Sequence, residues 1–191
     1  MLVTRLALSH ENEWAMSVLN SWKESLDQHA ELLHHAVFQA VFAINPSNLA
    51  DAKLRATSLR AAKWLLSVLE GTVQTLHGIR PTDQADWTEE RTKKFKEAYS
   101  VVDEIVSRLY YNIRHHEGTE EISSEATRDY YVTIKPLLET VTLLGRRDRR
   151  GIVLAPTAHH FMQLMNEVLS YEPKAVLHMA TDVAEANEAA G

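Results

Sequence analysis

The residues best suited to bind a metal ion are a glutamate and a histidine three positions apart, Glu31 and His34. On a helix this spacing places both side chains on one face, so that a single turn can offer an oxygen and a nitrogen ligand. Di-iron carboxylate bundles use such a motif twice, together with two further glutamates. The sequence has no second Glu-x-x-His motif and no cysteine. We therefore expect Glu31 and His34 to form a polar flank of a helix, and we expect no metal or other cofactor.

Histidine is abundant, with ten residues that include the adjacent pairs His34-His35, His115-His116 and His159-His160. Neighbouring residues on a helix point about 100° apart, so an adjacent pair cannot readily chelate one ion as histidines at i and i+4 do. Surface and helix-capping roles are the favoured prediction for these residues. The alternative is pH sensing or incidental metal capture.

The most concentrated charge lies in the loop Gly145-Arg146-Arg147-Asp148-Arg149-Arg150-Gly151. Arginine forks bind phosphate or carboxylate with paired hydrogen bonds, and the flanking glycines would let the loop wrap an anion. The Gly-Lys-Ser/Thr ending of phosphate-binding loops is absent from the sequence. Pairing with acidic residues of this chain or of a partner is therefore favoured over a nucleotide or nucleic-acid site. The arginines concerned are Arg146, Arg147, Arg149 and Arg150.

Overall charge and motif content narrow the function further. Twenty basic against twenty-six acidic residues give a formal net charge of −6, which disfavours general affinity for a nucleic-acid backbone. The Gly-x-Ser-x-Gly, His-Glu-x-x-His, dinucleotide-binding and kinase signatures are all missing from the sequence. A non-enzymatic protein is the better hypothesis.

Aromatic and arginine side chains dominate the energetics of protein interfaces, so the four tryptophans are candidates for contact with a partner. Trp64 lies beside the apolar stripe of a predicted helix and Trp87 lies in a predicted helix cap. We expect both of them to be exposed. Trp22 falls on an apolar stripe and is predicted to be buried.

Two long amphipathic helices are the strongest structural prediction, because apolar residues recur at steps of three and four in two segments. The first stripe is Leu59, Ala62, Leu66, Leu69, Val73 and Leu76, and the second is Phe95, Ala98, Val102, Ile105, Leu109 and Ile113. Gly78 and Pro81 between them predict that the helices fold back as an antiparallel hairpin. Gly71 is predicted to mark the close approach of a neighbouring helix.

Weaker patterns predict further helices on either side. Ser9 is the expected N-cap of a helical region that reaches Ile44, in which a break near Asp27 is favoured over one unbroken helix. A later helix contains Pro136, which is predicted to kink or split it. Two shorter helices, at residues 157–170 and after Pro173, complete the prediction.

No segment alternates with the period of a strand, so the predicted fold is all-α, with about six to eight helices in an antiparallel bundle or a short α-solenoid. We expect one domain over residues 1–191, with 1–117 and 118–191 as candidate sub-units. The last helix pair, joined by Tyr171-Glu172-Pro173, resembles a hairpin of HEAT- or armadillo-type repeats, as found in large bacterial multidomain proteins. This resemblance implies partner binding and supplies no catalytic residue.

The leading hypothesis is a helical protein-interaction or scaffold domain, either complete or part of a larger protein. The first alternative is an anion- or nucleic-acid-binding module that uses Arg146 to Arg150, and the second is a metal-dependent helical-bundle enzyme. Apolar runs are too short or too interrupted for a secretory signal or a membrane span, and the absence of cysteine suits a reducing compartment. We therefore expect a cytoplasmic protein with a protein partner. A homo-oligomer is also compatible with the sequence.

Overall fold

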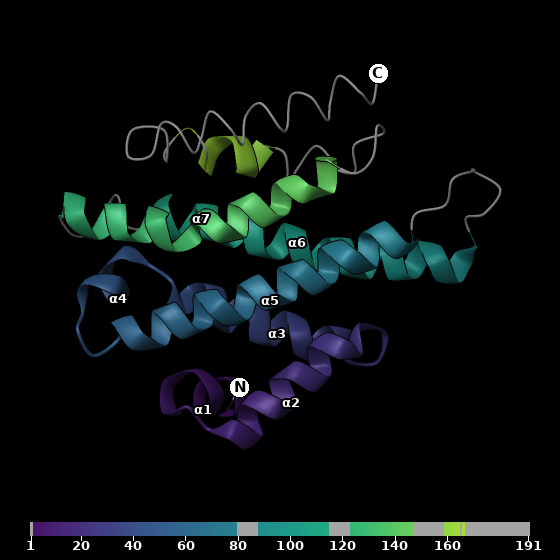
Figure 1. Cartoon of the computed structure of the whole chain (residues 1–191), viewed down its shortest axis with the longest axis horizontal. Coiled ribbons are helices and arrows are strands. Elements are labelled where there is room, and N and C mark those ends of the chain that lie inside the picture. Colours follow the sequence, from purple (N-terminus) through teal and green to yellow (C-terminus); the bar gives the residue numbers. More distant parts are fainter. Residues whose placement is uncertain (1, 80–87, 115–122, 147–158, 165, 167–191) are drawn as a thin grey trace.

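The computed structural model describes residues 2–79, 88–114, 123–146, 159–164 and 166. These residues are almost all helical and contain no β-strand, so the all-α prediction is confirmed for the described part of the chain (Figure 1). The helices are α1 (Leu2–His10), α2 (Glu13–Glu24), α3 (Leu26–Ala43), α4 (Pro46–Ala50), α5 (Arg55–Ile79), α6 (Glu89–Arg114) and α7 (Ser124–Arg146). Residues 159–164 and 166 are also helical.

Helix α5 is the centre of the fold, because it packs against each of the other six helices from α1 to α7. Figure 1 shows it crossing the middle of the molecule, with α1 and α2 on one side and α7 on the other. Since neighbours cover α5 on several sides, its buried residues are not confined to one narrow stripe. They are Ser58, Ala61, Ala62, Trp64, Leu65, Val68, Leu69, Thr72, Val73 and Leu76.

The predicted inward face of α5 is partly wrong. Leu59, expected in the core, is 45% exposed, whereas Trp64, expected at the surface, is only 4% exposed. A polar residue contributes to the true inward face: Ser58 Oγ donates a hydrogen bond of 2.7 Å to the carbonyl of Ala43 at the end of α3. Because its hydroxyl is satisfied, Ser58 can be buried where a hydrophobic pattern would not place it.

The N-terminal region begins with a helix that the sequence analysis missed. Ser9 lies inside α1, so its predicted role as an N-cap is wrong. Asn12 caps α2 instead, and its side-chain oxygen accepts a hydrogen bond of 2.9 Å from the backbone N–H of Ala15. The predicted break near Asp27 is confirmed, because α2 ends at Glu24 and α3 is a separate helix.

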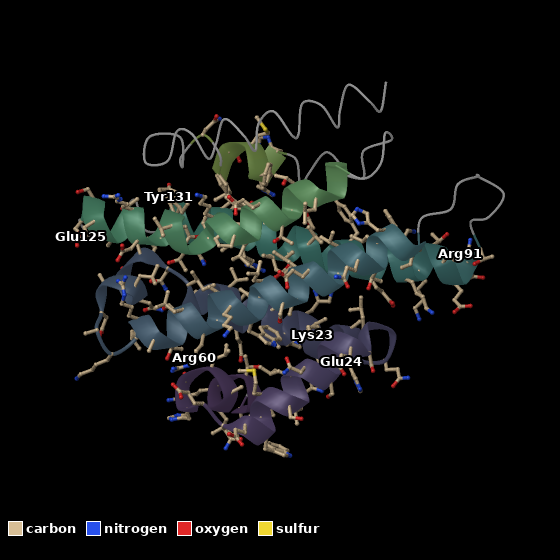
Figure 2. The ribbon with its side chains drawn as sticks, in the orientation of Figure 1. Lys23, Glu24, Arg60, Arg91, Glu125 and Tyr131 are labelled. Carbon is tan, nitrogen blue, oxygen red and sulfur yellow. The ribbon has the colours of Figure 1, made fainter. Side chains whose placement is uncertain are left out.

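Arg60 attaches this N-terminal pair of helices to α5. Its Nε donates a hydrogen bond of 2.7 Å to the carbonyl of Leu8, and its Nη1 forms an ion pair with Glu11. Figure 2 shows Arg60 extending from α5 toward α1. The carbonyls in the last turn of a helix have no partner within the helix, so Arg60 supplies a donor that α1 lacks. Lys23 Nζ lies 3.4 Å from Ser67 Oγ and makes a second polar contact between α2 and α5.

Helix α7 is continuous through Pro136, so the predicted split does not occur. Figure 1 shows the second half of this helix running in a different direction from the first, in agreement with the predicted kink. Pro136 is exposed. A proline on the solvent side of a helix removes one backbone donor, and water can reach the carbonyl left without it.

Tyr130 joins α7 to α6 inside the core. Its hydroxyl donates a hydrogen bond of 2.7 Å to the carbonyl of Leu109, and the side chain has no exposed surface. Burial raises the pKa of the Tyr130 phenol well above its ordinary value of 10.0, and the neighbouring Tyr131 raises it further. The phenol therefore stays neutral, and its O–H group donates to the carbonyl of Leu109.

This arrangement predicts a pH-dependent effect of Tyr130→Phe. Below pH 10 the variant should be less stable by about 1 kcal/mol, because the buried hydrogen bond is lost. Above pH 10 the unfolded phenol ionises while the folded one does not, so the wild type loses about 1.4 kcal/mol per pH unit through this group. The phenylalanine variant has no such loss. Urea unfolding between about pH 8 and about pH 11 should show the stability difference shrinking as the pH rises, and a constant difference would contradict the burial of a neutral phenol.

Gly71 does not mark a close helix approach, so that prediction is wrong. A Cβ atom built at this position has no heavy atom within 4 Å, leaving aside the backbone of the helix itself and the adjacent residues. Glycine in a helix interior is destabilising relative to alanine, because it has more conformational freedom to lose on folding. Gly71→Ala should therefore raise the free energy of unfolding by about 0.5–1 kcal/mol, measured by urea unfolding. A loss of stability would show that this face of α5 is more tightly packed than the structure has it.

Candidate interaction surface

Helices α3 and α6 lie side by side and run in the same direction. Near the middle of α3, His34 Nε2 lies 3.0 Å from the hydroxyl of Ser100. At the end of α3, Asn112 Nδ2 donates hydrogen bonds of 2.8 Å and 3.0 Å to the carbonyls of Val41 and Ile44. The last carbonyls of a helix need donors from outside it, and here α6 provides them. The two helices are thereby held in a fixed register.

Two phenylalanines on α3 lie outside its buried face. Phe38 and Phe42 are four residues apart, and their rings stack with centroids 6.4 Å apart. Their exposed fractions are 39% and 67%. A single exposed aromatic ring is ordinary, but adjacent rings on one face form an apolar patch.

Arg108 on α6 lies against this patch. Its guanidinium carbon is 4.7 Å from the centroid of the Phe38 ring, within the range of a cation–π interaction. Its Nε donates a hydrogen bond of 2.9 Å to the carboxylate of Glu104, one turn earlier in the same helix. These two contacts hold the Arg108 side chain beside the Phe38 ring.

Tyr111 extends the aromatic surface along α6. It is 43% exposed, and its ring meets those of Tyr110 and His160 edge-on at 5.5 Å and 5.6 Å. A hollow of about 400 Å³ opens at this point of the surface. We call it the α3–α6 groove, and its lining residues are Phe38, Phe42, Arg108, Tyr111 and Asn112.

A second, larger hollow of about 780 Å³ lies between α1, α2 and α5, with an acidic lining. Its carboxylates do not converge on one point. Glu11 is paired with Arg60, while Glu13 and Glu24 are the first and last residues of α2, roughly 16 Å apart at 1.5 Å per residue. This hollow therefore offers no compact site for an ion or a reacting group.

The predicted site residues whose side chains the structure describes are Glu31, His34 and Trp64, and none of them lines either hollow. Glu31 is exposed and His34 contacts Ser100. The described residues contain no group of three or more His, Cys, Asp or Glu side chains with the geometry of a metal site. Trp64 is buried in α5, where its indole N–H has no acceptor among the described residues, so the expectation of an exposed contact is wrong. Trp22 is buried as predicted.

The remaining predicted residues lie wholly or partly outside the described part of the chain. Trp87, Arg147, Arg149 and Arg150 lie outside the described residues. Arg146 is the last residue of α7, but its side chain is not described. The helix pair that resembles HEAT or armadillo repeats is described only at residues 159–164 and 166. In that segment Phe161 and Leu164 are buried.

The contact between His34 and Ser100 joins a potential base to a potential nucleophile. The hydroxyl of Ser100, however, donates to the backbone carbonyl of Glu97 at 2.7 Å. It therefore accepts from His34 and has no proton to give it. Neither of the two hollows includes this pair, and the contact links two helices rather than forming a reactive site.

Sequence reasoning missed the residues of the α3–α6 groove, although one signal for them was present. Phe38 and Phe42 share an i, i+4 spacing but lie beside the buried stripe of Leu33, Val37, Ala40 and Ile44. Two aromatic residues so placed indicate a second apolar face. No local sequence pattern identifies Arg108 or Tyr111 as groove residues, because their position depends on how α6 packs on α3.

The described part of the chain is thus all-α, with an aromatic groove on its surface between α3 and α6. Comparisons with protein-family models, with curated proteins and with solved structures find no match to this chain. Every helix in the described residues is too short or too polar to cross a bilayer.

Proposed function

We propose that this chain is a non-enzymatic helical protein-interaction domain, and that the α3–α6 groove binds a protein partner. The observation that supports this proposal is the exposure of Phe38, Phe42 and Tyr111 around one hollow, beside Arg108. Aromatic and arginine side chains provide most of the hot spots of protein interfaces.

The groove suits binding better than catalysis. Besides the hydroxyl of Tyr111, its polar side-chain groups are the guanidinium of Arg108 and the amide of Asn112, and these two already make contacts within the chain. Neither group transfers protons near neutral pH. A fixed aromatic surface loses little conformational entropy when a partner binds, because α3 and α6 are already locked together.

A site-specific cross-linking experiment tests this proposal. The chain has no cysteine, so Phe42→Cys and Leu59→Cys each introduce a single attachment point for a benzophenone maleimide, and at position 42 the aromatic rings of the label replace the lost phenyl ring. Leu59 is the matched control, because it is a large exposed apolar residue on another helix. After irradiation in an extract of cells that express the chain, the label at position 42 should capture a specific protein and the label at position 59 should not.

A second substitution distinguishes specific capture from nonspecific cross-linking. Tyr111→Ala, added to Phe42→Cys, should abolish the cross-link, because it removes one wall of the groove. Equal capture from positions 42 and 59, or capture that is insensitive to Tyr111→Ala, would contradict the proposal.

A further inference from the structure

The chemistry of the α3–α6 groove also indicates what kind of partner segment fits it. We infer that the groove takes a short amphipathic helix that carries an acidic side chain for Arg108. This inference rests on the proposed function and makes it more specific.

The size of the apolar patch favours a short segment. Phe38, Phe42 and Tyr111 are exposed by 39%, 67% and 43%. At 150–250 Å² per aromatic side chain, they present roughly 300 Å². A stable interface between two folded proteins needs about 800 Å² from each partner. The patch is therefore too small to hold a second copy of this chain and matches the few anchor residues of a peptide.

The shape of the surface favours a helix over an extended strand. The groove lies between α3 and α6, which run parallel, and its lining residues belong to helical turns, whose main-chain N–H and C=O groups bond one another. No sheet edge among the described residues could pair with an extended peptide. A groove between two helices accepts a ridge of side chains from a third helix. The anchoring side chains of such a helix lie at positions i, i+4 and i+7.

The charge of the groove selects for an acidic residue. A guanidinium has five N–H donors, and Arg108 uses one of them, on Nε, to bind Glu104. In the described part of the chain its two Nη groups make no hydrogen bond. A carboxylate that approaches along the groove can accept from both, in the paired geometry that arginine favours. The aromatic walls would partly shield this pair from water and so strengthen it.

Two helical peptides of about 15 residues test the inference, because this length is near the minimum for a stable isolated helix. Both carry leucines at i, i+4 and i+7 on an alanine background. One has glutamates beside the leucines, and the other has lysines there. Binding to the folded chain would be followed by NMR shifts of backbone amides at about 0.15 M salt, where distant charges are screened.

The glutamate peptide should bind about threefold to tenfold more tightly than the lysine peptide. It should shift residues around Phe38 and Tyr111. This preference opposes the net charge of −6, which by itself attracts the lysine peptide. Arg108→Glu should reverse the preference. Arg5→Glu, at an exposed position on α1, makes the same change in net charge and should leave the preference intact.

The results of the peptide and cross-linking experiments distinguish failure of the inference from failure of the proposed function. Equal binding of the two peptides, or binding of neither, would overturn the acidic helix as the occupant, while cross-linking from position 42 would still support the proposed function. Dimerisation of the chain, lost in Phe42→Ala and detected by sedimentation, would identify a second copy as the occupant and would also overturn the inference. Failure of cross-linking at position 42 would overturn the proposed function itself.

Discussion

Replacing Leu65 with alanine should lower the free energy of unfolding by about 3–4 kcal/mol, the usual range for a leucine that leaves a cavity in a packed core. Leu65 has no exposed surface and belongs to α5, which contacts every other helix from α1 to α7. The surrounding structure cannot easily relax into a cavity at this position, because helices on several sides would have to move together. The loss is a large fraction of the 5–15 kcal/mol that holds a typical domain folded.

Leu59→Ala is the matched control for this prediction. It makes the same chemical change on the same helix, at a position that is 45% exposed. It should lower the free energy of unfolding by less than about 1 kcal/mol. Urea unfolding of both variants measures the difference directly. Similar losses in the two variants would show that the inward face of α5 includes Leu59, as the hydrophobic pattern alone predicts.

Phe42→Ala should weaken partner binding by about 30-fold to 100-fold, equivalent to 2–3 kcal/mol. The side chain is 67% exposed, so most of its apolar surface is free to be buried by a partner. The same exposure predicts that folding stability falls by less than about 1 kcal/mol. Titration calorimetry with the partner that cross-linking identifies would measure the affinity. Leu59→Ala should leave this affinity unchanged. An affinity that does not respond to Phe42→Ala would mean that the partner binds elsewhere.

The long helices could be predicted from the sequence because their apolar spacing is regular over many turns. All but one of the six residues predicted inward on α6 are buried, and Phe95 is partly buried. The face of α5 was predicted less well, since a helix covered on several sides buries residues that a single stripe does not include. Buried hydroxyls such as that of Thr72, which donates to the carbonyl of Val68 at 2.8 Å, are invisible to a hydrophobic pattern.

The groove could be predicted only in part. The i, i+4 spacing of Phe38 and Phe42 is local information, and it marks an aromatic face on α3. Arg108 and Tyr111 come from a helix that is separated from α3 by both α4 and α5 in the chain. Their place beside Phe38 follows from the parallel packing of α3 and α6, which no local pattern encodes.

The lysines near the start of α6 are paired with glutamates of the same helix. Lys94 lies 3.2 Å from Glu90 and Lys93 lies 3.8 Å from Glu97, in each case one helical turn away. Such exposed pairs stabilise a helix only slightly. They nevertheless reduce the local positive charge, so this cluster is a solvated face and not a strong basic patch.

The central claim is that the α3–α6 groove is the binding surface. Hydrogen exchange of the chain, alone and bound to the partner that cross-linking identifies, tests it most directly. If the α3–α6 groove is the binding surface, slower exchange on binding should be confined to the segments that contain Phe38, Phe42 and residues 108–112. Protection centred on α1 and α2, or no change in the groove segments, would contradict it.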